Sequence, residues 1–206
     1  MFKRAAIFIG LAVIATPDVA HGEDAPVWKG NGIAAVAGGG VTGFTDKAVR
    51  DVVSSDVGGA WDLRVTLGSR RAVALDVSYL GMGANVRGPG DAASGVLEGT
   101  TFEAAARYNF LAGETWRPYA FFGIGWQHYG IRGATFDLMD AGMRSHDNLL
   151  DLPVGAGLAY HHHSGLLLDV RATYRTTEYN GLVRDTPTAY AAMNTWQLSA
   201  GIGYEL

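Results

Sequence analysis

Three stretches of the sequence carry residue types that could do chemistry. Residues 161–163 are three consecutive histidines, and imidazole nitrogens bind zinc, copper or nickel. Residues 145–147 read Ser-His-Asp, the residue types of a hydrolytic triad. Residues 38–40 are three glycines, but neither the lysine nor the helix of a phosphate-binding loop follows them. What the first two stretches can do depends on the elements that position them.

Adjacency in the chain argues against chemistry at both stretches. Consecutive residues of a strand point to opposite faces, so three adjacent histidines rarely converge on one ion. A triad is a spatial arrangement assembled from separated positions, which adjacent residues seldom achieve. We therefore predict no metal site, no cofactor and no catalytic residue, and keep an enzyme as an alternative.

The composition excludes several classes of protein. A chain of 206 residues suggests one domain. Charged residues make up 17% of the chain, below the typical share of about 25%, and glycine is abundant at 29 residues. A net charge of −4 argues against the basic surface that nucleic-acid binding requires. The absence of cysteine excludes a disulfide framework and thiolate chemistry.

The amino-terminal residues have the order of a secretory signal. Lys3 and Arg4 precede an apolar run over residues 5–15 and then a polar stretch. Ala20 and Gly22 are small residues at the two positions that a signal peptidase would read, which predicts cleavage after Gly22. The alternative is an uncleaved anchor, but about eleven apolar residues are too few for the roughly 20 that span a bilayer. We therefore expect an exported protein.

Seven segments of the remaining chain alternate strictly between two kinds of residue. In the last one, Trp196 and Leu198 share one face, and Gln197 belongs to the other. This period of two is typical of half-buried β-strands, and helical spacing fits none of the seven segments. An eighth segment, residues 33–45, has the length of a strand, but which way its faces point stays open. The seven segments are residues 58–71, 72–81, 100–110, 117–129, 150–160, 165–179 and 195–206.

The second face of these segments favours a membrane barrel over a soluble sandwich. A sandwich would carry lysine, glutamate and threonine there, whereas this face holds glycine, alanine and serine, and lysine after the signal occurs only at Lys29 and Lys47. Small residues opposite large ones suit a narrow closed barrel, and closure leaves no unpaired backbone in hydrocarbon. We predict an all-β fold, an eight-stranded antiparallel up-and-down transmembrane β-barrel. A soluble ligand-binding barrel is the alternative.

The predicted domain organisation and orientation follow from the joints between strands. Residues 1–22 are the expected signal peptide, residues 23–32 a periplasmic segment, and residues 33–206 the barrel. Outer-membrane barrels have short periplasmic turns and longer outer loops. The joints alternate from long to short and begin and end long, so both termini are expected in the periplasm. They fall near residues 46–56, 68–71, 85–95, 111–117, 131–148, 161–164 and 179–193.

Outward-facing aromatic residues form two predicted girdles. Amphipathic rings are enriched at both interfaces of a bilayer, so girdles at both ends of the strands support the membrane interpretation. The outer girdle consists of Trp61, Tyr79, Trp126, Tyr174 and Trp196. The periplasmic girdle consists of Tyr108, Phe110, Tyr160 and Tyr204.

Several stretches carry a family resemblance: the signal, the strand pattern, RPYAFFGIGW at 117–126, LDVRATYR at 168–175 and the carboxy-terminal stripe. In these the chain resembles the small eight-stranded outer-membrane barrels of the OmpA transmembrane-domain type, the outer membrane protein β-barrel domain of Gram-negative bacteria. The resemblance implies outer-membrane lipid and lipopolysaccharide as surroundings, and we expect a monomer. Members commonly end in an aromatic residue read by the barrel-insertion machinery; here Leu206 is last and Tyr204 is the nearest aromatic. Some such barrels modify lipid A, which defines the enzyme alternative.

Charged residues on the inward face predict a filled interior. Eight strands enclose a space that side chains approximately fill, and an unpaired buried ion costs several kcal/mol. We therefore predict an ion-paired plug, with a structural role or a role in surface interaction through the outer loops. A narrow or gated porin-like channel is the alternative, and the pairing itself depends on a register that stays open. The predicted network contains Asp62, Arg64, Asp76, Glu103, Arg107, Asp169, Arg171, Arg175 and Glu205.

Arginines of the outer loops could contact lipopolysaccharide. Guanidinium groups bind phosphates through two parallel hydrogen bonds, and the outer leaflet is rich in lipopolysaccharide phosphate. Ordinary solvation of loop charges is the alternative. The residues concerned are Arg87, Arg132, Arg144 and Arg184.

Overall fold

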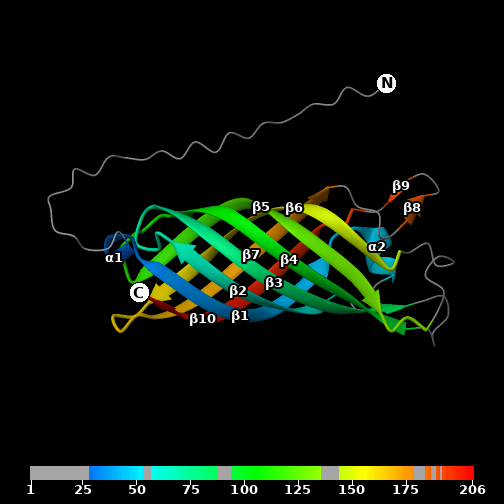
Figure 1. The fold of residues 1–206 in the computed structure, drawn as a ribbon, viewed down its shortest axis with the longest axis horizontal. Helices are drawn as coiled ribbons and strands as arrows, with labels where there is room; N and C mark the ends of the chain where they lie inside the picture. The colour runs from blue at the N-terminus through cyan, green and yellow to red at the C-terminus, as the bar shows by residue number, and fades with distance from the viewer. Residues whose placement is uncertain are drawn as a thin grey trace, which may run out of the picture.

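Eight long antiparallel strands form a closed barrel in the computed structural model of this protein (Figure 1). The structure describes residues 28–52, 57–87, 94–135, 144–178, 184–186, 189–190 and 192–206. Around the barrel the strands follow the order β1-β10-β7-β6-β5-β4-β3-β2, which confirms the predicted fold. Their bounds are β1 (Ile33–Phe44), β2 (Gly58–Leu67), β3 (Val73–Arg87), β4 (Ser94–Asn109), β5 (Trp116–Arg132), β6 (His146–His161), β7 (Leu166–Glu178) and β10 (Thr195–Glu205).

Four short elements lie outside the barrel wall. They are α1 (Trp28–Asn31), α2 (Lys47–Val52) and a two-stranded sheet of β8 (Arg184–Thr186) and β9 (Ala189–Tyr190). The described helices are too short and polar to cross a membrane. The predicted signal peptide lies outside the described residues, and of the predicted periplasmic segment only residues 28–32 are described.

The two ends of the barrel differ in the length of their connections. At one end, three short turns join β2 to β3, β4 to β5 and β6 to β7, and each holds a glycine with positive φ: Gly68, Gly113 and Gly165. β1 begins and β10 ends there, beside α1 (Figure 1). We call this the short-turn end. α2, β8 and β9 lie at the opposite, long-loop end (Figure 1).

Strand lengths depart from the prediction at the long-loop end. β3 runs to Arg87 and β4 begins at Ser94, inside the joint expected over 85–95. The sequence pattern also predicted neither α2 nor the β8–β9 hairpin. The longer strands have a physical reason, because beyond the bilayer a strand no longer needs an apolar outward face and the alternation that marks it disappears. Hydrogen bonding can continue where the hydrophobic pattern has stopped.

The last strand closes the barrel against the first. β10 pairs with β1 from Ala34↔Glu205 to Phe44↔Thr195. Glycine is required at this seam, because a Cβ on Gly40 would lie 2.0 Å from the carbonyl oxygen of Leu198. The facing of β1, open in the sequence, is settled by burial: Ala34 and Val36 are on the buried side.

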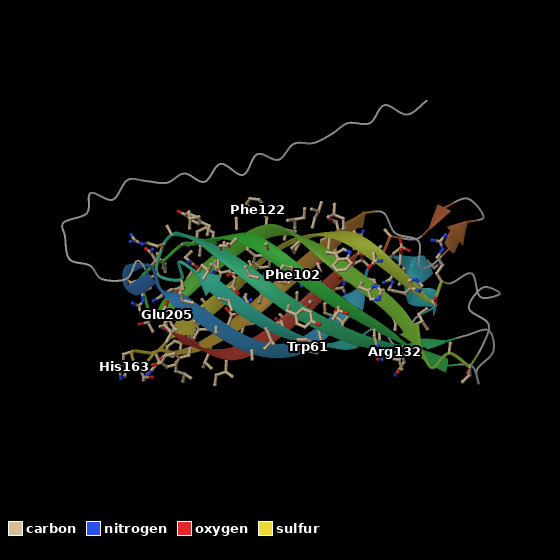
Figure 2. The ribbon with its side chains drawn as sticks, in the orientation of Figure 1. Trp61, Phe102, Phe122, Arg132, His163 and Glu205 are labelled. Atoms are coloured by element: carbon tan, nitrogen blue, oxygen red, sulfur yellow. The ribbon has the colours of Figure 1, made fainter. Side chains whose placement is uncertain are left out.

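Apolar side chains cover the outside of the barrel and charged ones fill the inside. Trp61 and Ile124 expose 43% and 54% of their surface, and in Figure 2 Trp61, Phe102 and Phe122 stand on the outer surface. Arg64 and Arg171 are instead buried. A soluble ligand-binding barrel has the opposite facing, so that alternative is wrong.

Candidate functional site

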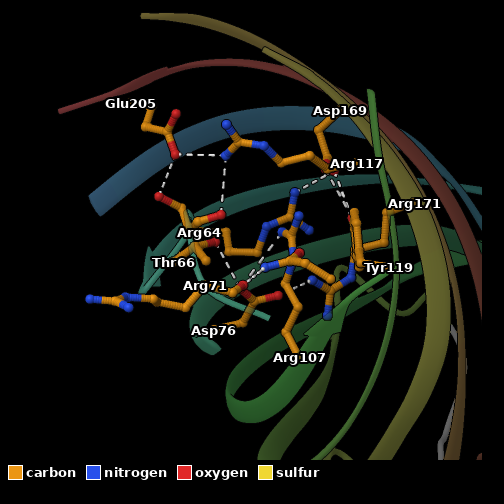
Figure 3. A network of polar contacts seen from close by, with 12 residues as sticks. Arg64, Thr66, Arg71, Asp76, Arg107, Arg117, Tyr119, Asp169, Arg171 and Glu205 are labelled. Atoms are coloured by element: carbon orange, nitrogen blue, oxygen red, sulfur yellow. Dashed lines mark hydrogen bonds and ion pairs between the residues drawn. The ribbon is translucent and has the colours of Figure 1, made fainter. Parts of the chain in front are cut away.

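A cross-barrel cluster of polar side chains fills the middle of the lumen (Figure 3). Arg64 on β2 donates a hydrogen bond to Asp169 on β7, and the Tyr119 hydroxyl on β5 donates to the same carboxylate at 2.9 Å. β2 and β7 are not neighbours in the barrel, so this contact spans the interior. All three side chains are buried.

Asp76 on β3 organises the second half of this central cluster. Its carboxylate accepts hydrogen bonds from the Thr66 hydroxyl at 2.7 Å and from Arg171 at 2.9 Å, and Arg107 lies 3.9 Å away. The same two guanidinium groups stack on aromatic rings: Arg107 lies 3.5 Å from the ring centroid of Tyr119, and Arg171 lies 3.4 Å from that of Phe121. Ion pairing and cation–π stacking together fix each guanidinium in place.

A second cluster lies nearer the long-loop end. Arg175 on β7 donates from Nε to Glu103 on β4 at 2.5 Å and from Nη1 to Gln197 on β10 at 2.9 Å. Asp151 on β6 lies 3.6 Å from the same Nε. Two carboxylates therefore share one guanidinium in a site closed to solvent.

A third cluster closes the lumen at the short-turn end. Glu205, the last residue of β10, accepts hydrogen bonds from the Ser69 hydroxyl at 2.5 Å and from Arg117 at 2.9 Å. His161 Nδ1 lies 3.0 Å from its other oxygen. The carboxy-terminal strand is thus tied to the β2–β3 turn, to β5 and to β6.

Apolar side chains occupy the long-loop end of the lumen instead. Val49 on α2 and Met193 before β10 are fully buried, as is Tyr129 on β5. The rings of Tyr129 and Phe44 lie 6.1 Å apart, and the Tyr129 hydroxyl donates to the sulfur of Met82. The lumen therefore has an apolar cap at one end and charged clusters below it.

The nine predicted interior residues are all buried, and eight of them take part in ion pairs. Asp62 is the exception: its Oδ1 has no hydrogen-bond partner among the described residues. The prediction missed Arg117, which fell in an expected joint, and His161, which was assigned to a turn. Asp151 was also missed, although its alternation with Leu152 marked it as inward.

The predicted girdle aromatics all lie on the outward side of their strands. Several of these rings contact one another edge to face: the ring centroids of Trp61 and Tyr79 lie 5.4 Å apart, and those of Tyr108 and Phe110 lie 5.3 Å apart. Their outward faces are substantially exposed: Trp126 at 60%, for example. Such rings fit the interfaces of a bilayer.

The predicted loop arginines are described only in part. Arg132 is 79% exposed in its side chain and pairs with Glu98 at 2.9 Å, and Arg144 is exposed. Figure 2 shows Arg132 at the opposite end of the barrel from His163. The side chains of Arg87 and Arg184 lie outside the described ones.

The stretches that could do chemistry are spread apart by the fold. His161 points into the lumen, whereas the rings of His162 and His163 lie in the following turn, with centroids 3.8 Å apart and planes tilted by 43°. Ser145 contacts His146 at 3.0 Å, but the Asp147 carboxylate accepts a hydrogen bond from the backbone of Asn148. In the described part of the chain, no three His, Cys, Asp or Glu residues come together as candidate metal ligands.

Comparison with known proteins identifies a family and a fold. Residues 6–205 match the family model described as outer membrane protein beta-barrel domain. The crystal structure of Neisserial surface protein A aligns with 14% identity and a TM-score of 0.55, over 84% of this chain and 96% of that one. Ail of Yersinia pestis, solved with the heparin analogue sucrose octasulfate, aligns with 15% identity and a TM-score of 0.53, over 85% and 99%. The outer membrane enzyme PagL aligns with 16% identity and a TM-score of 0.41, over 84% and 98%, too low for any argument about activity. A search of curated proteins found no match.

Proposed function

Because the chain belongs to the outer membrane protein β-barrel family, we propose that it is a closed, non-conducting barrel that holds its long loops at the cell surface. One observation carries this proposal: ion pairs cross the lumen at several levels, and apolar side chains cap one end. Arg64 and Asp169 come from opposite sides of the barrel, as do Asp76 and Arg171. Both ion pairs therefore lie in the path that a solute would take.

Blockage follows from the size of the barrel. Eight strands leave an interior just wide enough for side chains to fill, and here those side chains are arginine, tyrosine and phenylalanine. Tyr119 and Phe121 are buried, and Tyr119 lies beside the Arg107 guanidinium. A conducting path would require several ion pairs to break together, each in surroundings that water does not reach.

Planar-bilayer recording tests this function. The wild-type protein is expected to give no steady channels. The double variant Tyr119→Ala/Arg171→Ala removes bulk from the central cluster and is expected to give discrete openings. Phe122→Ala is the matched control, because it removes a ring from the lipid-facing side of the same strand. Large, steady, ungated channels in the wild type would refute the proposal.

The surface role depends on orientation, which we infer from the two ends of the barrel. Short turns and both barrel termini share one end, as expected for the periplasmic side of an exported barrel with a cleaved signal peptide. The long-loop end then faces the cell exterior and presents Arg132 and Arg144 toward lipopolysaccharide phosphates. Protease accessibility in intact cells tests this orientation: cleavage only within the short turns would overturn it.

Lipopolysaccharide binding by the loop arginines has its own test. A charge-assisted hydrogen bond contributes about 1.5–3 kcal/mol, so Arg132→Ala/Arg144→Ala should weaken binding to lipopolysaccharide-containing vesicles about tenfold or more. Arg71→Ala removes an exposed charge at the short-turn end and serves as the control. Equal binding by all three proteins would show that these arginines are simply solvated.

A further inference from the structure

Two acidic side chains converge over a glycine in the lumen. Glu103 on β4 and Asp151 on β6 both pair in register with Gly125 on β5, which lies between them. A Cβ on Gly125 would lie 2.8 Å from Cγ of Glu103 and 3.3 Å from Oδ2 of Asp151. Both acids therefore lean into the space that a larger residue at Gly125 would occupy.

Several oxygens at this place are buried without a hydrogen bond. Asp151 is fully buried, and neither of its carboxylate oxygens has a hydrogen-bond partner among the described residues. The same holds for Oε2 of Glu103. Oε1 of Gln127, two residues along the inward face of β5 from Gly125, is likewise buried and unbonded. Four buried oxygen acceptors without a hydrogen bond thus lie on three adjacent strands, β4, β5 and β6.

The positive charge at this site is smaller than the negative charge. Arg175 Nε lies 2.5 Å from Glu103 and 3.6 Å from Asp151, and its Nη1 is occupied by Gln197. Arg171 also lies near Glu103 but is paired with Asp76, so Arg175 is left to face two carboxylates, and one negative charge stays uncompensated in a site closed to water. A buried charge without a partner costs several kcal/mol, so a further cation at this position would stabilise the folded barrel.

We propose that the lumen binds one hard metal cation between Glu103 and Asp151, with the side-chain oxygen of Gln127 as a further ligand. Carboxylate and amide oxygens are the ligands that hard cations prefer. A single positive charge neutralises the cluster, so a monovalent ion such as sodium matches the charge count better than calcium or magnesium. This site does not depend on the surface role proposed above, because it lies inside the barrel.

The test measures folding against cation concentration. The full chain is folded into lipid vesicles at constant ionic strength, with sodium replaced stepwise by N-methyl-D-glucamine, and the thermal midpoint is followed by heat-dependent gel mobility. Calcium and magnesium are tested in separate arms. At a cation concentration about 100 times the Kd, the folded-to-unfolded ratio should rise about 100-fold. Equilibrium dialysis with labelled sodium should give one ion per chain.

Matched variants separate this site from general salt effects. Asp151→Asn and Glu103→Gln should abolish both the stabilisation and the bound ion. Asp62→Asn, which changes a buried carboxylate elsewhere in the lumen, should retain both. Stability that is the same in every cation, or that changes only with pH, would overturn the proposal by showing that a proton alone neutralises the pair. Cation dependence that survives both site variants would overturn it as well. If a variant does not fold, the wild-type dialysis still decides.

Discussion

Replacing Asp76 with alanine tests whether the lumen is closed to water. Asp76 is fully buried and receives the Thr66 hydroxyl at 2.7 Å and Arg171 at 2.9 Å, with Arg107 at 3.9 Å. The Asp76→Ala variant keeps both guanidinium groups inside the barrel and removes the carboxylate between them. We expect a large loss of stability, because two buried positive charges then face each other without a counter-charge.

The magnitude follows from the burial of the pair. Removing one partner of a buried ion pair costs about 3–5 kcal/mol, whereas an exposed pair contributes about 0.2–1 kcal/mol. At about 1.4 kcal/mol per factor of ten, the folded-to-unfolded ratio should fall by about two to three and a half orders of magnitude. The double variant Asp76→Ala/Arg171→Met removes both charges and should recover a substantial part of this loss.

Urea unfolding in lipid vesicles, followed by tryptophan fluorescence, measures this effect. The four proteins of the cycle are the wild type, Asp76→Ala, Arg171→Met and the double variant, and their coupling energy isolates the pair. Glu114→Ala, at an exposed position in the β4–β5 turn, is the control and should change stability by less than about 0.5 kcal/mol. A loss below about 1 kcal/mol for Asp76→Ala would refute the reasoning, because it would mean that water reaches the carboxylate.

Two further comparisons test the seam and the lipid face. Gly40→Ala places a Cβ 2.0 Å from a backbone carbonyl oxygen and should destabilise the barrel by about 1–3 kcal/mol in urea unfolding, whereas Gly59→Ala meets nothing within 4 Å and should be nearly neutral; equal effects would contradict the seam geometry. Ile124→Arg, at the middle of an outward face, should cost about 2–4 kcal/mol, and Val73→Arg, at the short-turn end, about 0–1 kcal/mol. Similar losses at both positions would show that lipid does not cover Ile124.

The facing of the barrel could be predicted from the sequence because lipid imposes a rule on every second residue. Leu75 and Ile124 face lipid and must be apolar, whichever residues lie on the neighbouring strands, whereas inward positions are free of this rule and can hold a charge such as that of Asp76. Closure could be predicted for a separate reason, because an open sheet edge in hydrocarbon would leave backbone N–H and C=O groups unpaired. The facing of β1 could not be predicted, because Ala35, Ala37 and Gly39 make the side chains of its outward face as small as those of its inward face.

The pairing of charges could not be predicted, because it depends on stagger between strands rather than on alternation. Glu103 and Arg107 share a face of β4 but do not pair with each other. Glu103 accepts a hydrogen bond from Arg175 across the lumen, and Arg107 lies near Asp76. Arg117 and His161 reach the lumen from strand ends, where alternation fades. The roles of both residues become visible only when β10 brings Glu205 beside them.

One strand, β7, supplies a partner to three of the ion pairs that cross the lumen. β7 contributes Asp169 to Arg64, Arg171 to Asp76 and Arg175 to Glu103. The partners lie on β2, β3 and β4, three or four strands away around the closed ring, so none of these pairs can form between hydrogen-bonded neighbours. They become possible only when β7 has curved round to face the first half of the chain. The buried charges therefore favour the closed barrel over an open or mispaired sheet, which would leave them without partners or exposed to water. This preference gives a physical reason for so many charged side chains in so narrow a lumen.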